Sequence, residues 1–376
     1  MMKTLKDLNV EGKKVLLRVD FNVPLDENKK VKDATRIEEA LPTIKELIKR
    51  NAKQIIIMAH FKRPKGKVNE DMRLEPVSLK LHELLGEHVS YSKDLTVPEG
   101  KIVLLENIRF YAGEEKNDPV FCKQLAALGD CYVNDAFGTA HRAHASTEGV
   151  ARLLPHAAGL LMEKEVNNLQ KVLNNPEKPI VAIIGGAKIS TKIGLIKNLL
   201  PKVEYLLLGG ALANTVLLAQ NHKLGKSLVE ADLTDTVKDL LSNKLRLPED
   251  VIVSKSIEDK ADLKIKAVGE IEPDEMALDI GPDTVSLYNE AISKAKTIIW
   301  NGPMGIFEEE EFAKGTLAIA KAVAASSAYS VIGGGETVEA VKAMGLADKI
   351  SFISTGGGAM LEFLEGKKLP GVIALN

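Results

Sequence analysis

Residues 179–190, PIVAIIGGAKIS, pass from a run of apolar, mostly β-branched residues through a pair of glycines into a helical pattern. The same order recurs in three later stretches: EYLLLGGA (204–211), YSVIGGGET (329–337) and ISFISTGGGA (350–359). Repeated units of strand, glycine turn and helix are typical of an α/β domain with a parallel sheet. In such domains the chemistry lies at the carboxyl ends of the strands.

The first half of the chain repeats this pattern with a different ending. Its apolar runs lead into arginine, histidine and carboxylate side chains, in VLLRVDFNVP (15–24), QIIIMAHFKRPKG (54–66), KIVLLENIRF (101–110) and DCYVNDAFGTAHRAH (130–144). Helical stretches with apolar residues at three- and four-residue spacing separate these runs. Because parallel strands need crossovers, the first half also predicts a parallel sheet covered by helices.

The length of 376 residues is too great for a comfortable single core and favours roughly two to three domains. We predict two α/β domains, at 1–155 and 176–358. The residues between them, 156–175, read as an amphipathic helix followed by a Pro- and Asn-containing loop. The tail from about 359 to 376 keeps apolar residues to its end, so we expect it to pack on another part of the chain.

Composition and charge narrow the class of function. The formal net charge of −2 and the isoelectric point near 6.4 give no overall electrostatic reason to expect a nucleic-acid partner. Cys122 and Cys131 are the only cysteines, which favours reduced thiols over a disulfide framework or a zinc site. The N-terminus has no apolar signal region, and no run of eighteen apolar residues occurs. We therefore expect a cytoplasmic protein without a membrane partner.

The glycine-rich turns indicate a phosphate ligand. Glycines between a strand and a helix let phosphate oxygens approach backbone N–H groups, and the helix N-terminus adds partial positive charge. One such turn is explained equally well as a tight left-handed turn, whereas four in one domain favour a polyphosphate. Neither standard nucleotide motif is complete. The sequence GKS at 225–227 has Gln220 where a P-loop needs glycine, and the glycines at 333–335 are followed by Val338 where a dinucleotide fingerprint needs one.

Charged residues accompany these turns. Lys188 and Lys192 stand four residues apart at a predicted helix start, so we expect them to share one face beside the backbone donors. Two ammonium groups oppose the helix dipole there, and a bound anion would relieve this; two solvated lysines are the alternative. Glu308 could accept hydrogen bonds from ribose hydroxyls or simply begin a solvated acidic run. Glu336 could be an N-terminal helix acid or hold a magnesium ion bound mostly through water and phosphate.

The charged residues of the first half form a second candidate site. Arginines in four different units converge on one sheet edge, and guanidinium groups grip phosphate or carboxylate in a bidentate manner. Each arginine alone is better explained as a surface ion-pair partner, but the set suits a small, doubly anionic substrate. Its members are Asp20, Asn22, Arg36, His60, Arg63, Arg109 and Arg142. His141 and His144 have an HxxH spacing without a third ligand or a catalytic glutamate, so a substrate-orienting or packing role is favoured over a metal site.

Taken in order, VDFNVP, RPKG, LLENIRF, DAFGTAHRAHAST, GGAKIS, GGALANT, WNGPMGIFE, GGGET and STGGGA resemble the phosphoglycerate kinase family over essentially the whole chain. The resemblance implies the reversible glycolytic transfer of the acyl phosphate of 1,3-bisphosphoglycerate to MgADP, which gives 3-phosphoglycerate and MgATP. It implies an α/β fold of two doubly wound, parallel-sheet (Rossmann-like) domains joined by a hinge helix at 156–175. The tail from about 359 to 376 would pack back on the N-terminal domain.

The resemblance also implies roles for single residues. The seven polar residues of the first half would bind phosphoglycerate. The nucleotide would be bound by Lys188, Lys192, Gly209, Gly210, Gly281, Pro303, Ile306, Glu308, Gly334, Gly335, Glu336 and Thr337. Arg36 and Lys192, with the helix starts at Gly335 and Gly357, would stabilise the moving phosphoryl group, assisted by Mg²⁺, for which Glu336 is the candidate ligand. Transfer involving a carboxylate needs positioning and charge neutralisation instead of a general base, and it needs domain closure to exclude water.

The chain departs from the family pattern in three places. Ala59, Phe61 and Lys62 replace residues of the family's SHLGRP motif, and Lys62 adds charge near the substrate phosphate. Glu336 stands where the family usually has aspartate, and the extra methylene could move the metal by about a bond length. The stretch KDLTVPEGKIVLLEN (93–107) lacks a helix that most members have before this strand, with little functional effect expected.

Two other classes of function compete with this interpretation. The incomplete dinucleotide fingerprint argues against an NAD-dependent dehydrogenase. Retention of Lys192 and Arg36 argues against a non-catalytic metabolite sensor, because a binder has no need of transition-state charge. An enzyme whose site lies in its own cleft needs no second copy, so we expect a monomer.

Overall fold

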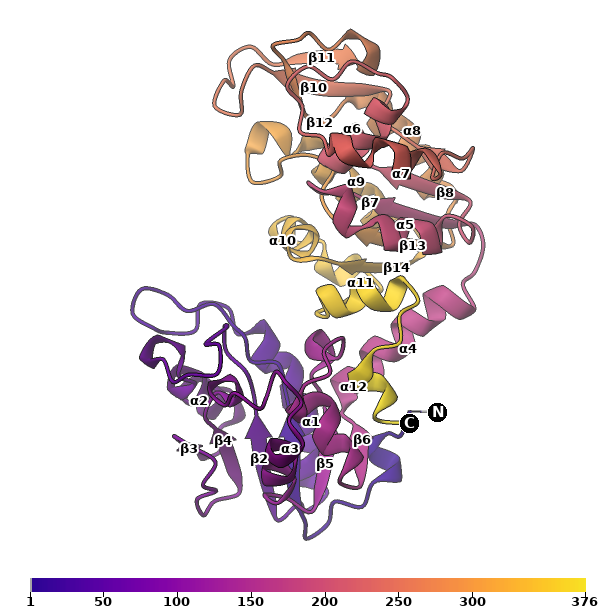
Figure 1. The fold of residues 1–376 in the computed structure, drawn as a ribbon. Coiled ribbons are helices and arrows are strands. Elements are labelled where there is room, and N and C mark those ends of the chain that lie inside the picture. The colour runs from indigo at the N-terminus through magenta and orange to yellow at the C-terminus, as the bar shows by residue number, and fades with distance from the viewer. Residues whose placement is uncertain (1) are drawn as a thin grey trace. The chain divides into compact units, whose positions relative to one another are not determined.

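The computed structural model describes residues 2–376 and divides into two compact units (Figure 1). Unit 1 runs to Asn167 and takes in the returning segment Lys368–Asn376, and unit 2 is Asn168–Lys367. Each unit is built on its own parallel sheet. This arrangement confirms the predicted α/β fold of two parallel-sheet domains.

The sheet of unit 1 has the strand order β3-β4-β2-β1-β5-β6, and its pairs are parallel. Its central strands are buried along almost their whole length, as expected where helices cover both faces. The strands are β1 Lys14–Arg18, β2 Gln54–Met58, β3 Val89–Ser92, β4 Ile102–Leu105, β5 Cys131–Asn134 and β6 His156–Ala158.

The helices of unit 1 follow the predicted apolar spacing. The helices that follow the strands of this sheet include α1 Thr35–Lys49, α2 Glu75–Leu85 and α3 Pro119–Ala126. In α1, residues Ile37, Ala40 and Ile44 recur at three- and four-residue intervals and are buried against the sheet. Asp118 caps the N-terminus of α3, because its carboxylate accepts hydrogen bonds from the N–H groups of Val120 and Phe121.

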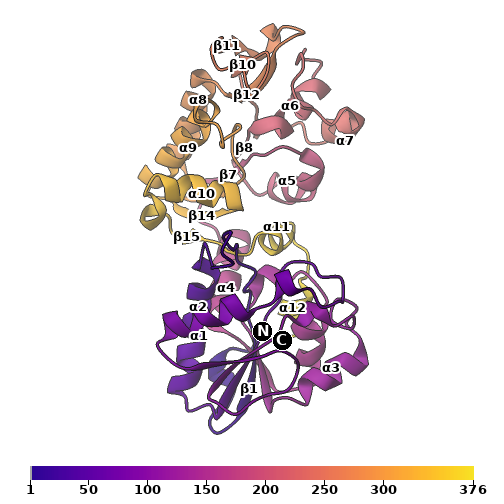
Figure 2. The same cartoon turned by 90° about the vertical axis from the view of Figure 1, so that its left-hand side faces the viewer.

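The main sheet of unit 2 has the order β15-β14-β13-β7-β8-β9, again with parallel pairs. Its strands are β7 Ile180–Ile184, β8 Tyr205–Leu208, β9 Leu245–Arg246, β13 Thr297–Asn301, β14 Tyr329–Gly333 and β15 Phe352–Ile353. Its helices are α5 Ile193–Leu199, α6 Gly210–Ala219, α7 Thr234–Lys238, α8 Pro282–Lys294, α9 Lys314–Ala325, α10 Gly335–Ala343 and α11 Gly358–Leu364 (Figure 2).

A second sheet in unit 2 was not predicted. It is antiparallel and consists of β10 Asp250–Ser254, β11 Lys264–Ala267 and β12 Met276–Ile280, with β10 in the middle. In Figure 1 it lies at the end of unit 2 farthest from α11. It interrupts the alternation of strands and helices between β9 and α8.

The segment that joins the units differs from the prediction. Residues 156–158 are not part of the connecting helix, because they form β6, which pairs with β5 at the edge of the unit 1 sheet. The connecting helix α4 begins only at Leu160, ends at Asn174 and passes from one unit to the other after Asn167.

The returning segment is also shorter than predicted. It begins at Lys368 and not at about 359, because α11 packs against α5 within unit 2 and the Leu364 carbonyl accepts a hydrogen bond of 2.6 Å from Asn198. The last helix, α12 Pro370–Ile373, belongs to unit 1. There the Gly371 N–H donates to the Ala140 carbonyl at 2.8 Å.

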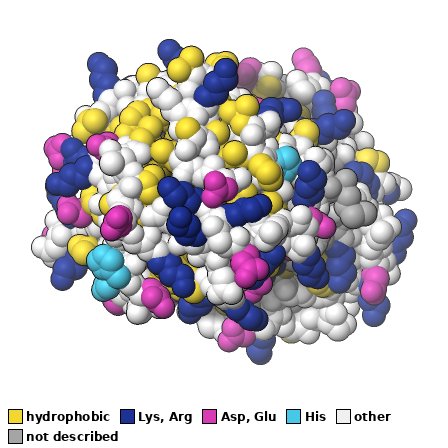
Figure 3. Space-filling model, turned by 90° about the horizontal axis from the view of Figure 1, so that it is seen from below, with side chains coloured by type: hydrophobic (Ala, Val, Ile, Leu, Met, Phe, Trp, Pro, Cys, Tyr) yellow, Lys and Arg dark blue, Asp and Glu magenta, His cyan; other side chains and the backbone are white. Residues whose placement is uncertain are grey.

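Two further properties are the distribution of charged side chains on the surface and the composition of the helices. Acidic and basic side chains are interspersed with apolar ones over the face seen in Figure 3, in keeping with a net charge of −2. Among residues 2–376, no helix combines the length and the apolar composition needed to cross a membrane.

Candidate functional site

The polar residues predicted for the first half gather at the carboxyl edge of the unit 1 sheet. Asp20 and Asn22 follow β1, His60 and Arg63 follow β2, Arg109 follows β4 and Arg142 follows β5. Arg36 comes from the first turn of α1. Strand order brings these segments together, because β2, β1 and β5 are neighbours in the sheet.

Asp20 is the acidic centre of this cluster. It forms an ion pair with Arg36 and accepts a hydrogen bond of 3.2 Å from the Asn22 N–H. Burial disfavours the charged form, but the nearby His60 ring and the Arg36 and Arg18 guanidinium groups outweigh it, so the pKa of Asp20 lies below its ordinary value. Asp20 is therefore an anion that holds the Arg36 side chain in place through an ion pair.

His60 is neutral in this setting. Its side chain is only 4% exposed, and burial, reinforced by Arg18, Arg109 and Arg36, holds its pKa well below 6.5 against the opposing effect of Asp20. Arg18 Nη2 lies 3.3 Å from His60 Nδ1. Because a guanidinium group can only donate, Nδ1 must accept and the ring proton lies on Nε2. The Nε2–H group is then a donor for an anionic ligand.

Arg109 and Arg142 differ in how firmly they are held. Arg109 is 5% exposed, donates to the Lys62 carbonyl at 2.8 Å and has its Nε 3.3 Å from Glu115. Burial, together with the charge of Arg18, lowers the pKa of Arg109 to about 10. Arg142 is half-buried and donates to His141 Nε2 at 3.2 Å. Arg63 is exposed on the loop after β2.

His141 and His144 do not lie on one helical turn, because both precede the helical segment Ala145–Gly149. Burial and the charges of Arg109, Arg18 and Arg142 lower the pKa of His144 to about 3, so it is neutral. Within residues 2–376, no group of three histidine, cysteine or acidic side chains is arranged to hold a metal ion.

Arg18 was not predicted, although it lies at the centre of the cluster. It is the last residue of β1, and its side chain is fully buried. In sequence it is a single charge inside an apolar run, and the partners that stabilise it come from distant segments. Its proximity to His60 and Asp20 could be known only from the structure.

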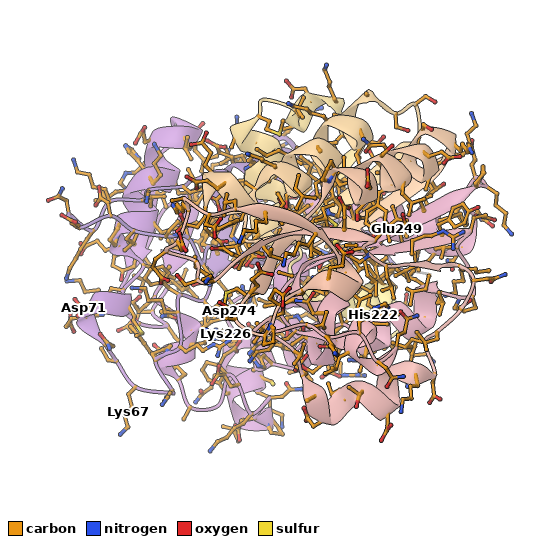
Figure 4. The ribbon with its side chains drawn as sticks, turned by 90° about the horizontal axis from the view of Figure 1, so that it is seen from above. Lys67, Asp71, His222, Lys226, Glu249 and Asp274 are labelled. Atoms are coloured by element: carbon orange, nitrogen blue, oxygen red, sulfur yellow. The ribbon has the colours of Figure 1, made fainter. Side chains whose placement is uncertain are left out.

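The second candidate site is a cavity of about 470 Å³ in unit 2. Five predicted residues line it: Gly210, Pro303, Ile306, Glu308 and Glu336. Its apolar wall, which sequence reasoning missed, comes mainly from β12 and from Leu228 and Ile257. Lys226 also lines the cavity, and it lies beside Asp274 (Figure 4). The unpredicted antiparallel sheet thus supplies one side of this pocket.

Two predicted residues, Gly209 and Gly281, do not line the cavity. A Cβ atom on Gly209 would lie 2.5 Å from Met304 Sδ, and one on Gly281 would lie 2.2 Å from the Asp250 carboxylate. These positions need glycine because neighbouring side chains press on them. Their contribution to the pocket is therefore to its shape.

Lys192 and Lys188 are not paired on one helix face, contrary to the expectation. Helix α5 begins at Ile193, after both lysines, and Lys188 has an extended backbone and an exposed side chain. Lys192 is mostly buried, and its ammonium donates to the carbonyl oxygens of Gly185 at 2.6 Å and Asn301 at 3.3 Å. Burial lowers the pKa of Lys192 to about 8, against the opposing effect of Glu336.

Two glycine-rich turns present helix N-termini. Gly334 precedes α10 with φ of 98°, and Gly357 precedes α11 with φ of 51°, both in the region that favours glycine. Gly335 has open space around its Cα, since a Cβ there would meet no atom within 4 Å. Thr337 is buried, and its hydroxyl accepts a hydrogen bond of 2.7 Å from the Gly302 N–H. The space beside Gly335 is therefore open to a ligand, whereas the Thr337 side chain is engaged within the unit.

Glu336 has the chemistry of a magnesium ligand, but among residues 2–376 it belongs to no group of three acidic, histidine or cysteine side chains arranged to hold a metal ion. It is exposed in the first turn of α10 and lines the cavity. A hard carboxylate oxygen suits Mg²⁺, which commonly takes one or two protein ligands and completes its shell with water and phosphate. The residues present therefore fit a metal ion that binds together with a nucleotide. They fit less well a site in which protein side chains alone coordinate the metal.

Comparison with known proteins gives one consistent result. The family model described as phosphoglycerate kinase matches residues 5–367. The phosphoglycerate kinase of Moorella thermoacetica is 53% identical over 99% of this chain and 98% of its own, and that of Roseiflexus castenholzii is 54% identical over 100% and 99%. The solved phosphoglycerate kinase of Coxiella burnetii has a TM-score of 0.92 and 42% identity, and covers 100% of this chain and 99% of its own.

Proposed function

This chain belongs to the phosphoglycerate kinase family, and on that premise we propose how its residues perform the family's reaction. The reaction is a glycolytic phosphoryl transfer to and from a carboxyl group, between 1,3-bisphosphoglycerate with ADP and 3-phosphoglycerate with ATP. Our proposal concerns the role of each residue in this reaction.

The arginine cluster of unit 1 binds the phosphoglycerate. The observation that supports this most directly is the convergence of Arg36, Arg109 and Arg142 around a neutral His60 on one sheet edge. Arginines bind phosphate and carboxylate bidentately, and the His60 Nε2–H adds a neutral donor. Asp20 keeps Arg36 in position, and Asn22 holds the Lys62 backbone by accepting a hydrogen bond of 2.9 Å. Arg63, on the exposed loop, completes the set.

The cavity of unit 2 binds the nucleotide. Its apolar wall suits a base, Glu308 suits ribose hydroxyls, and the turn from Gly334 to Thr337 suits phosphates at a helix N-terminus. Lys188, which is exposed, reaches the phosphates from the turn before α5. Bound with the nucleotide, Mg²⁺ would neutralise charge on the phosphate oxygens, and Glu336 is the residue that would hold it.

The transfer itself needs no general base. The carboxylate of 3-phosphoglycerate is already ionised at neutral pH, so its oxygen attacks the γ-phosphorus of ATP while the bond to the leaving oxygen of ADP breaks. Arg36 from unit 1 and Lys192 from unit 2 neutralise the equatorial oxygens. The backbone N–H groups at the helix starts of Gly335 and Gly357 assist them.

Because the two ligands bind to different units, the units must close during turnover and exclude water from the acyl phosphate. Helix α4, which passes between the units, is the hinge in this proposal. All groups required come from one chain, so a monomer suffices, and the proposed location is the cytoplasm.

The first test is formation of ATP from 1,3-bisphosphoglycerate and ADP, with and without magnesium, in the parent and in Glu336→Asp. Magnesium-dependent turnover in the parent is expected. An inactive parent that is rescued by aspartate would show that the longer side chain impairs the metal site. Arg36→Ala and Lys192→Ala should lose turnover by orders of magnitude while ligands still bind; undiminished turnover in both would refute their catalytic roles.

A further inference from the structure

Arg18 lies deeper than any other charged group of the phosphoglycerate cluster. Its guanidinium group is fully buried, and such a charge is stable only with hydrogen bonds and counter-charge around it. Described residues supply partners for three of its five donors: Nε donates to Ser146 Oγ at 2.9 Å, Nη1 to the Val19 carbonyl, and Nη2 to His60 Nδ1 at 3.3 Å. The Nη2 end therefore faces the ligand side, and the Nε end faces the interior.

The interior end is fixed by a second residue that no part of the reaction uses. Glu114 is fully buried, and its carboxylate accepts two hydrogen bonds from Ser146: from the hydroxyl at 2.6 Å and from the backbone N–H at 3.0 Å. A serine hydroxyl has one proton. Because that proton is given to Glu114, a lone pair of Ser146 Oγ must face Arg18 Nε.

The backbone holds Glu114 and Ser146 together. The Ala145 N–H donates to the Glu114 carbonyl at 2.9 Å, so the loop after Phe110 is joined to the helical segment Ala145–Gly149 next to the serine. Burial raises the pKa of Glu114, and the charge of Arg18 and the hydrogen bonds from Ser146 oppose this effect. The buried arginine thus lies between Asp20 on the ligand side and Glu114 on the interior side.

We infer that Glu114, acting through the Ser146 hydroxyl, is a positioning residue that fixes the plane of the Arg18 guanidinium group and thereby aims its ligand-side N–H groups, and the Nε2–H group of His60, at the anionic substrate. This inference rests on the proposed function of the cluster. Without the relay, Arg18 keeps its charge but loses the acceptor that sets its rotation. Orientation of a charged hydrogen-bond donor affects affinity for the ligand it faces, and has no such effect on a ligand bound in the other unit.

The experiment compares steady-state kinetics of the full chain and its variants with 3-phosphoglycerate and ATP. Ser146→Ala and Glu114→Gln should raise KM for 3-phosphoglycerate about tenfold and leave KM for ATP within about twofold, as expected for one lost hydrogen bond to a charged group. Ser146→Thr, which restores a hydroxyl, should return KM towards the parent value. An unchanged KM for 3-phosphoglycerate in Ser146→Ala would overturn the inference.

A matched control separates positioning from simple loss of packing. The Tyr132 hydroxyl donates to the Ser146 carbonyl at 2.6 Å but is not on the path to Arg18. Tyr132→Phe should lower the thermal midpoint of unfolding without raising KM for 3-phosphoglycerate. A rise equal to that of Ser146→Ala would show that the KM effect follows stability alone, which contradicts the inference.

A spectroscopic measurement tests the same point without any turnover. In the full chain labelled with ¹⁵N-arginine, the Arg18 Nε–H signal, assigned by its absence in Arg18→Lys, should exchange slowly with water. It should exchange rapidly in Ser146→Ala. In the kinetic experiment, a parent protein without activity would refute the proposed function. In the spectroscopic experiment, equal exchange of the Nε–H signal in Ser146→Ala and in the parent would refute the positioning role.

Discussion

At the scale of single residues, Lys192 combines a catalytic assignment with a lowered pKa. Burial lowers this pKa to about 8, so the ammonium is fully charged at pH 6 and loses its proton as the pH rises through that value. We expect kcat/KM for MgATP to fall above about pH 8. The bound phosphates should raise the lysine pKa, so kcat should fall only at higher pH.

Lys192→Arg provides the check on this assignment. Arginine does not lose its proton in this range, so the alkaline fall in kcat/KM should disappear in the variant, even if its absolute rate is reduced. Both pH profiles, from pH 6 to 10, are the measurement. An alkaline limb that stays near pH 8 in the arginine variant would assign it to another group.

Lys62 offers a different test at the same scale, because its backbone φ of 53° lies in the left-handed region where glycine is favoured. Its N–H donates to Asn22 and its carbonyl accepts from Arg109, so the substrate cluster holds this conformation. Substitution to glycine usually destabilises a protein relative to alanine. Here we expect the reverse, with Lys62→Gly more stable than Lys62→Ala by up to about 1 kcal/mol.

Chemical denaturation of the two Lys62 variants measures this difference directly. Equal charge loss in both makes them a matched pair, so any effect of the ammonium on phosphate affinity cancels. If the alanine variant is the more stable one, the left-handed conformation is not the source of strain.

At the scale of elements, the N-terminus of α10 should bind phosphate through its backbone. A Cβ on Gly335 meets no protein atom within 4 Å, so Gly335→Ala should fold normally but crowd the approach of a phosphate. We expect KM for ATP to rise about tenfold or more with little change in thermal midpoint.

Gly345, just after the same helix, is the control position. It has φ of 64° with open space around it, so Gly345→Ala should cost about 1 kcal/mol of stability and leave KM for ATP unchanged. Kinetics and thermal unfolding of both variants should therefore show opposite patterns. Loss of stability in Gly335→Ala with unchanged KM would argue against phosphate binding at this turn.

The same scale shows what sequence reasoning could reach. Continuous apolar runs such as that of β7 and amphipathic spacing such as that of α1 are local signals, and both were predicted as observed. The antiparallel sheet was missed because strands such as β11, KIKA, are short and largely exposed and have no apolar run. Lys192 and Arg18 show how far the geometry of a site can be predicted from sequence. Their settings depend on Asn301 and Ser146, which lie 109 and 128 residues away in the chain, so no local pattern contains them.

At the scale of the whole molecule, pH should affect the stability of unit 2 through a buried carboxyl group. Asp279 in unit 2 is 3% exposed and accepts hydrogen bonds from the N–H groups of Gly315 and Ile280. Burial outweighs these bonds and raises its pKa to about 7. Because the folded state then holds the proton more tightly than the unfolded state, Asp279 contributes stability at low pH that is lost as pH rises from about 4 to about 7.

The fluorescence of Trp300 reports the unfolding of unit 2 alone, because Trp300 is the only tryptophan and is buried in the core of that unit. We expect the free energy of unfolding reported by its fluorescence to fall with pH in the parent relative to Asp279→Asn, by roughly 1 to 4 kcal/mol over this range. The asparagine variant itself should be destabilised at low pH, because one acceptor is lost. A parent-to-variant difference that does not depend on pH would contradict the raised pKa.

The returning segment has a consequence for how the chain could be rewired. The Lys3 N–H donates to the Leu375 carbonyl at 2.8 Å, so the two ends of the described chain lie side by side within unit 1. A short linker could join them, and new ends could be opened in the exposed stretch at 175–179. In such a circular permutant unit 1 would be continuous in sequence, and residues 168–174, the end of α4 that belongs to unit 2, would follow it at the new C-terminus. The chain would then enter unit 1 at Lys367–Lys368, and α4 would end the chain instead of leading into β7.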